Sequence, residues 1–145
     1  SEILTFATNL EHVGDIVENL MEMAQKKDKK RIQFSEAGLK DLTQLHEQVT
    51  ENLKLALSIF LTSDVRLAQL LLSQKRKIIA LERESAERHM ARLREGRPES
   101  IETSALHMDI LRDLKRIHSH VVAVAYPILE RAGELEALPK RSEFD

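Results

Sequence analysis

The 145-residue chain is 42% hydrophobic and 32% charged, a composition typical of a globular protein and neither a disordered nor a membrane-embedded one. Its 22 basic and 24 acidic residues give a formal net charge of -2, which argues against a nucleic-acid-binding protein with a basic face. The absence of cysteine excludes disulfides and thiolate metal sites. Few aromatic residues, glycines and prolines favour helices over a sheet.

The first predicted helix covers residues 2–27. Its apolar residues recur at three- and four-residue steps: Ile3, Phe6, Leu10, Val13, Val17, Leu20 and Ala24. The charged run 26–31 is expected to be a solvated connector, with contact to a membrane surface as the weaker alternative. The chain opens on Ser1 without an initiator Met and enters this helix at once, so we expect a segment of a longer protein. No apolar run approaches the roughly 20 residues of a membrane span.

The second and third predicted helices cover residues 35–61 and 64–95. Ser35 is a favourable N-cap for the second, and residues 62–64 form a polar break before the third. Gly96 is a typical residue for ending the third helix. On the second helix, the stripe expected to face the core of the bundle consists of Leu39, Leu42, His46, Val49, Leu53, Ala56 and Phe60.

The fourth predicted helix covers residues 100–130. Pro127 predicts a kink or an early end, because proline cannot donate a backbone hydrogen bond. Leu111, Val122 and Tyr126 lie off its main apolar stripe and suggest a partner surface. Residues 134–145 are expected to be a flexible tail. Because the connections are short, the sequence predicts an all-α, antiparallel up-down bundle of four long helices over residues 1–133.

Two stretches carry a resemblance to a known family. Residues 9–15, Asn-Leu-Glu-His-Val-Gly-Asp, resemble the PhoU signature, in which an acidic residue is followed four residues later by Asp. Residues 106–117, Leu-His-Met-Asp-Ile-Leu-Arg-Asp-Leu-Lys-Arg-Ile, with the following His-Ser-His, are similar to the PhoU-like domain at the C-terminus of bacterial sodium/phosphate cotransporter-family proteins. The resemblance covers roughly residues 6–130.

The resemblance implies a cytoplasmic regulatory domain that acts in phosphate homeostasis. Its partner would be the transporter membrane domain in the same polypeptide, on the cytoplasmic side of the inner membrane, with a homo-oligomer left open and no nucleic acid. The alternative is a stand-alone, metal-binding regulator of phosphate signalling. In PhoU proteins the acidic motif binds metal, so the resemblance implies a divalent metal or iron at Glu11 and Asp15. Asp109 and Asp113 are a second candidate pair with the same spacing.

The residues themselves leave the metal open. Glu11, Asp15, Glu18 and Glu22 step along one face of the first helix, which suits either oxygen ligation of a hard cation or a solvated acidic face. If the fourth helix repeats the first, Lys115 and Ser119 stand where Glu11 and Asp15 do. A salt bridge between Lys115 and Glu11 would then replace the metal, and we expect weak or absent binding.

A polar layer inside the bundle is also expected. Helix heights at 1.5 Å per residue place polar residues of different helices at similar levels. The expected members are His46, Glu82, His89, His107, Asp113 and His120. A structural network that fixes helix register and a metal or phosphate site are the two interpretations. No nucleophile with a base, Gly-rich phosphate loop or His-Glu-x-x-His motif is present, so the chain is expected not to be an enzyme.

Overall fold

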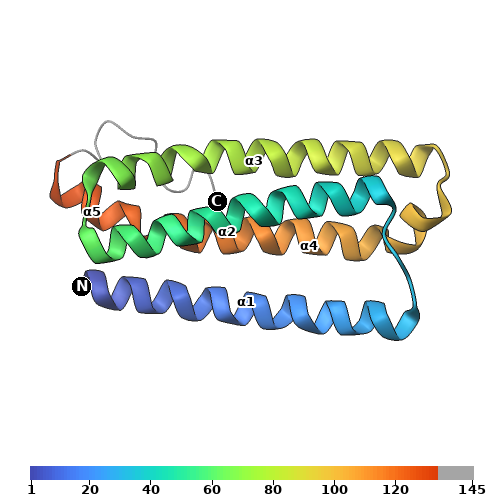
Figure 1. Cartoon of the computed structure of the whole chain (residues 1–145), viewed down its shortest axis with the longest axis horizontal. Helices are drawn as coiled ribbons and strands as arrows, with labels where there is room; N and C mark the ends of the chain where they lie inside the picture. Colours follow the sequence, from blue (N-terminus) through green and yellow to red (C-terminus); the bar gives the residue numbers. More distant parts are fainter. Residues whose placement is uncertain (134–145) are drawn as a thin grey trace.

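The computed structural model describes residues 1–133, which form an elongated helical bundle (Figure 1). Its helices are α1 (Glu2–Lys30), α2 (Glu36–Thr62), α3 (Val65–Arg94), α4 (Pro98–Val122) and α5 (Ala125–Arg131). No strand occurs in this part of the chain, so the all-α prediction is confirmed. The predicted tail 134–145 lies outside the described residues. None of the described helices is both long and apolar enough to cross a membrane.

Local signals in the sequence position the helix ends. The side chain of Ser35 accepts a hydrogen bond from the backbone N–H of Gly38 at 3.0 Å, and Asp64 caps α3 in the same way through Leu67 at 3.1 Å. Gly96 adopts a positive φ of 73° just beyond α3, a conformation that glycine tolerates best. Residues 26–31 were expected to be a connector, but α1 runs on to Lys30, and the basic residues of its last turn suit the negative end of the helix dipole.

The predicted fourth helix is interrupted before Pro127. α4 ends at Val122 and the short α5 begins at Ala125. Proline at 127 lacks the N–H that would bond to the carbonyl of Ala123, and that carbonyl instead accepts from Tyr126 in a 3.4 Å contact. The chain therefore bends where the i to i−4 ladder fails, and α5 packs against α3.

The helices are not packed as a square. Figure 1 shows α2 and α4 in the middle of the bundle, with α3 along one side and α1 along the other. α4 packs closely against α1, α2 and α3, whereas α1 makes very few close backbone contacts with α2. The core therefore lies mainly among α2, α3, α4 and α5, and α1 is a peripheral helix.

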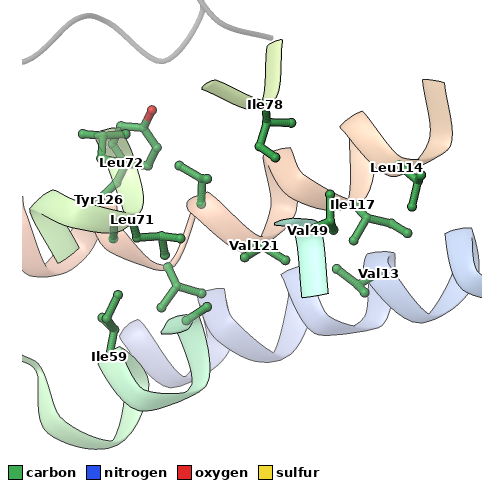
Figure 2. Packing of buried hydrophobic residues seen from close by; sticks show 14 of the residues in the cluster. Val13, Val49, Ile59, Leu71, Leu72, Ile78, Leu114, Ile117, Val121 and Tyr126 are labelled. Atoms are coloured by element: carbon green, nitrogen blue, oxygen red, sulfur yellow. The ribbon is translucent and has the colours of Figure 1, made fainter. Parts of the chain in front are cut away.

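Every helix contributes side chains to one apolar core (Figure 2). α1 contributes Val13, which Figure 2 places beside α4 residues such as Val121. Leu111, Val122 and Tyr126, which suggested a partner surface, are 0%, 0% and 3% exposed. That interpretation was wrong, because α4, which carries Leu111 and Val122, is the central helix, and α5, which carries Tyr126, packs against α3. An unusually wide apolar face is what such a position requires.

Candidate functional site

A largely buried charged cluster joins α2 to α3 near one end of the bundle. The carboxylate of Asp41 accepts hydrogen bonds from Nε of Arg88 at 3.0 and 3.1 Å and from Nη1 of Arg92 at 3.3 Å. Asp41 is 9% exposed and Arg92 is 6% exposed, so this pair is largely removed from water. Arg88 and Arg92 are one helical turn apart, which lets both guanidinium groups reach one carboxylate.

Two histidines stack beside this cluster. The rings of His89 and His107 lie 4.3 Å apart and 7° from parallel, and each residue is 1% exposed. Burial, followed by the nearby Arg92, lowers the pKa of His89. Burial lowers the pKa of His107 to about 4, with His89 and Arg92 acting in the same direction and Asp41 opposing them. Both rings are therefore neutral at physiological pH.

Several polar atoms of this region have no hydrogen-bond partner within residues 1–133. They are Nε and Nη2 of Arg92, Nε2 of His107, and the hydroxyls of Ser85 and Ser100. Gly38 lies beside them, since a Cβ at this position would be 3.0 Å from Oγ of Ser35 and 3.6 Å from Nη2 of Arg92. There is thus little free space beside Gly38, and we interpret the cluster as a structural clamp between α2 and α3.

A second polar group attaches α1 to α4. Asp113 is 0% exposed, and its carboxylate accepts from Nδ2 of Asn19 at 2.7 Å and from Nη1 of Arg116 at 3.2 Å. Two turns further along α4, the ring of His120 stacks on His12 at 4.8 Å, and its Nδ1 lies 3.0 Å from Oδ1 of Asn9. These contacts fix the position of the peripheral helix along α4.

A third polar group lies in the core. Nδ2 of Asn52 on α2 lies 2.8 Å from Nε2 of His118 on α4. Because an amide N–H donates, this arrangement uses Nε2 as the acceptor and leaves the ring proton on Nδ1. Burial, together with the charge of Lys75, lowers the pKa of His118 to about 4. The ring is held neutral as a hydrogen-bonded part of the core.

The six residues expected to form one polar layer do not lie together. His89 and His107 form one cluster, while Asp113 and His120 belong to the contact between α1 and α4. His46 is exposed, because the buried face of α2 is centred on neighbouring positions such as Leu45 and Val49. Glu82 is half-buried, and no hydrogen bond or ion pair joins it to Asp113 within the described residues. Helix heights alone do not determine which face a residue occupies.

The two candidate metal pairs occupy different surroundings. Glu11 and Asp15 are both exposed on α1. Asp109 is paired with Arg112 at 3.3 Å, and the carboxylate of Asp113 is used by Asn19 and Arg116. Among residues 1–133, no group of three or more His, Cys, Asp or Glu side chains is arranged to hold a metal ion. Metal binding at Glu11 and Asp15 stays a prediction that only a binding measurement decides.

We expect Mg²⁺, Ca²⁺, Mn²⁺ or iron to change the melting temperature of the chain little, since two exposed carboxylates supply few of the oxygen ligands that such ions require. Thermal melts with increasing metal concentration measure this directly, because saturable binding to the folded state stabilises it. Asp15→Ala is the test variant, and Glu84→Ala on α3 is a matched exposed control. A rise of several degrees that Asp15→Ala abolishes would show that this expectation is wrong and that the metal site exists.

The sequence did not single out Asp41, Arg88, Arg92 or His118 as site residues. A signal was present, since Asp41 is spaced four residues from the buried Leu45 and Arg88 and Arg92 are spaced one turn apart. A charged residue between apolar positions on a core-facing stripe points to a buried ion pair, provided that a partner helix carries the opposite charge.

The family of the chain follows from comparison with known proteins. The sequence profile described as the PhoU domain matches residues 42–128, which run from the first turns of α2 into α5. The chain belongs to the PhoU family. The matched range contains the motif at 106–117. It does not contain the acidic motif at 9–15.

Relatives of the PhoU-domain chain are similar over nearly its whole length. It is 41% identical over 99% of its residues to the "Putative inorganic phosphate export protein YjbB" of Salmonella typhimurium, of which it spans 26%. It is 42% identical over 94% of its residues to the protein of the same name in Escherichia coli K12, of which it spans 25%. The chain thus spans about a quarter of the length of these relatives. No solved structure matches it.

Proposed function

We propose that this PhoU-family chain is a non-catalytic regulatory and interaction domain on the cytoplasmic side of a membrane protein that moves phosphate. The observation that carries the proposal is its 41% identity, over 99% of its length, to a protein named for inorganic phosphate export. Because the chain spans 26% of that relative, the remaining polypeptide is the natural partner. Sodium dependence of the transport is part of the proposal and follows from the family resemblance of residues 106–117.

Two groups of contacts support an interaction role: the clamp of Asp41, Arg88 and Arg92, and the contacts that attach α1 to α4. They fix the helices against one another with buried ion pairs and neutral histidines, and the carboxylates of Asp41 and Asp113 are each engaged by neighbouring side chains. A domain of this kind acts through its surface and through its own stability. A change in either should alter the behaviour of the attached transporter.

The test uses the full-length protein that carries this chain, produced in a bacterial strain lacking its own phosphate exporters. Cells loaded with radioactive phosphate are diluted, and efflux is followed with sodium or choline as the external cation. Deletion of the domain or Asp41→Ala should change the efflux rate at equal protein abundance in the membrane, while Asp109→Ala should not.

Efflux that is unaffected by removal of the domain would contradict the regulatory role. Equal rates in sodium and choline would contradict sodium dependence alone. The alternative is a metal-dependent, stand-alone regulator, and the thermal melts with metal ions described above test its metal binding.

A further inference from the structure

α1 is attached to the rest of the bundle through one neighbouring helix. α2, α3 and α4 each pack against the other two, and α5 packs against α3, whereas α1 packs closely against α4 alone (Figure 1). Of the 29 residues of α1, only Val13 and Ile16 are buried, with Phe6 and Leu20 half-buried beside them. α2 and α3 have similar lengths, and each buries eight residues. The helices α2 to α5 therefore form a core that does not need α1 to close it.

The contact between α1 and α4 is open to solvent on the side of α2. A hollow of about 290 Å³ lies there and is lined by Leu20 of α1, Leu42 of α2 and Leu114 of α4. Further along, Val13 and Val121 line a smaller depression from the α1 and α4 sides. Water therefore reaches the edge of the α1–α4 contact, and α1 can leave its position without disturbing the packing between α2 and α3.

The polar contact at Asp113 is compatible with the loss of α1. Asn19 of α1 donates to the carboxylate of Asp113 at 2.7 Å, but the two cations beside this carboxylate belong to α4 itself. Nη1 of Arg116 lies 3.2 Å from it and Nε of Arg112 lies 3.6 Å from it. Removal of α1 therefore leaves no charge unpaired. It also returns to water a carboxylate that is 0% exposed, which recovers the cost of its desolvation and opposes the apolar gain of docking.

A short hinge joins α1 to a firmly anchored α2. Arg31 ends α1 with a positive φ of 54°, and the side chain of Ser35 caps α2. The ring of Phe34 packs edge-on against that of His107 at 6.1 Å, so the chain is held in place from Phe34 onward. Residues 31–33 are non-helical, and backbone rotation within them is enough to swing α1 away from α4.

We propose that α1 is a detachable helix, which either docks on α4 or is released as one unit about residues 31–33 while α2 to α5 stay folded. Release uncovers the face of α4 around Val121. The motion itself is independent of the proposed function, and its use as a switch rests on that function. A regulatory domain with a docked and a released α1 presents two different surfaces to the attached polypeptide, and any partner that prefers one of them shifts the balance.

Hydrogen exchange of the 145-residue chain, followed by mass spectrometry of peptic fragments, measures the release. Fragments within residues 5–25 should exchange about tenfold or more faster than fragments from the middle of α2, α3 and α4, because α1 opens without unfolding of the core. Equal protection of α1 and of these three helices would overturn the proposal, since α1 would then open only when the whole chain unfolds.

Two variants separate release as a unit from local fluctuation of the helix. Ile16→Ala removes a buried side chain from the middle of α1, so exchange should rise about fivefold or more, by a similar factor, throughout residues 5–25 and stay unchanged in α2, α3 and α4. Leu45→Ala, at a residue of α2 that is 1% exposed, is the matched core control. It should speed exchange in α2, α3 and α4. If Ile16→Ala affects only fragments that contain residue 16, or affects all the helices, α1 is not a separate unit.

A cross-link between α1 and α4 should abolish the release. The chain contains no cysteine, so Asn9→Cys combined with His120→Cys supplies its only two thiols, at positions whose side chains lie 3.0 Å apart. Joining them with a short bismaleimide should slow exchange in residues 5–25 by about tenfold relative to the same variant before cross-linking. The control joins Asp109→Cys to Arg112→Cys within α4 and should leave the exchange of α1 unchanged. No slowing by the α1–α4 cross-link would contradict the proposal.

The motion and the regulatory role fail separately. Fast, uniform exchange of α1 combined with phosphate efflux that does not depend on the domain removes the regulatory role and leaves the detachable helix. Equal protection of all the helices combined with efflux that does depend on the domain removes the detachable helix and leaves the regulatory role.

Discussion

Asp41→Ala is expected to lower the free energy of unfolding by about 3–5 kcal/mol, because it leaves Arg92 with a buried and uncompensated charge. Arg92 is 6% exposed and its Nη1 lies 3.3 Å from the carboxylate of Asp41. Arg88 is about half exposed and can return to water, so the cost arises mainly at Arg92. Urea denaturation followed by circular dichroism measures the change.

The control is Asp109→Ala, which removes a carboxylate paired with Arg112 at 3.3 Å where both side chains are about half exposed. It should cost less than 1 kcal/mol, as exposed ion pairs do. The double variant Asp41→Ala with Arg92→Met should be more stable than Asp41→Ala alone, because no charge is left buried. If Asp41→Ala unfolds no more easily than Asp109→Ala, then the clamp does not hold α2 to α3.

The start of α2 and both ends of α3 could be predicted because they depend on local chemistry, whereas α1 runs to Lys30, beyond its expected end at residue 27. Ser35 and Asp64 each cap a helix with their own side chains, and Gly96 has the positive φ that its position after α3 requires. Pro127 interrupts the helix because it has no backbone N–H to donate to the carbonyl of Ala123. None of these features needs knowledge of the neighbouring helices.

The faces of the helices could be predicted only in part, because they depend on the packing partners. On α1 the apolar residues form a stripe so wide that Val13 and Leu10 both belonged to the expected core, yet Val13 is 7% exposed and Leu10 is 45% exposed. On α2 the buried face includes Asp41 and Leu45 and excludes His46. The sequence shows that a residue is apolar, but the distance between α1 and α2 decides whether anything covers it.

The second large effect is expected from pH. The pKa of His107 falls from 6.5 to about 4 in the folded state, with burial as the largest cause. The pKa of His118 falls from 6.5 to about 4, again mainly because of burial. Between about pH 6.5 and pH 4 the unfolded chain therefore binds more protons than the folded chain at these two residues. The folded state is stabilised above this range, and the stabilisation is lost as the pH falls through it.

The size of the loss follows from the same pKa values. By pH 5 each ring should have lost roughly 2 kcal/mol relative to pH 7.5, since the unfolded imidazole is mostly protonated and the folded one is mostly neutral. Protonation of His118 would also break its 2.8 Å hydrogen bond with Asn52, because two donors would then face each other beside Lys75. His107 would become charged against Arg92, with only Asp41 to compensate.

Urea denaturation at several pH values between 7.5 and 5 tests the assignment. His118→Gln should be less stable than the original chain at pH 7.5, because Gln does not fill the space of the imidazole, but it should lose less stability on acidification. His107→Gln should behave in the same way, whereas His46→Gln, at an exposed position of α2, should leave the pH dependence unchanged. If the slopes of His118→Gln and His107→Gln equal that of the original chain, the two rings are not held neutral by burial. The two rings would then carry a charge inside the core. For His118 that charge would be costly, because no carboxylate lies among its contacts within residues 1–133.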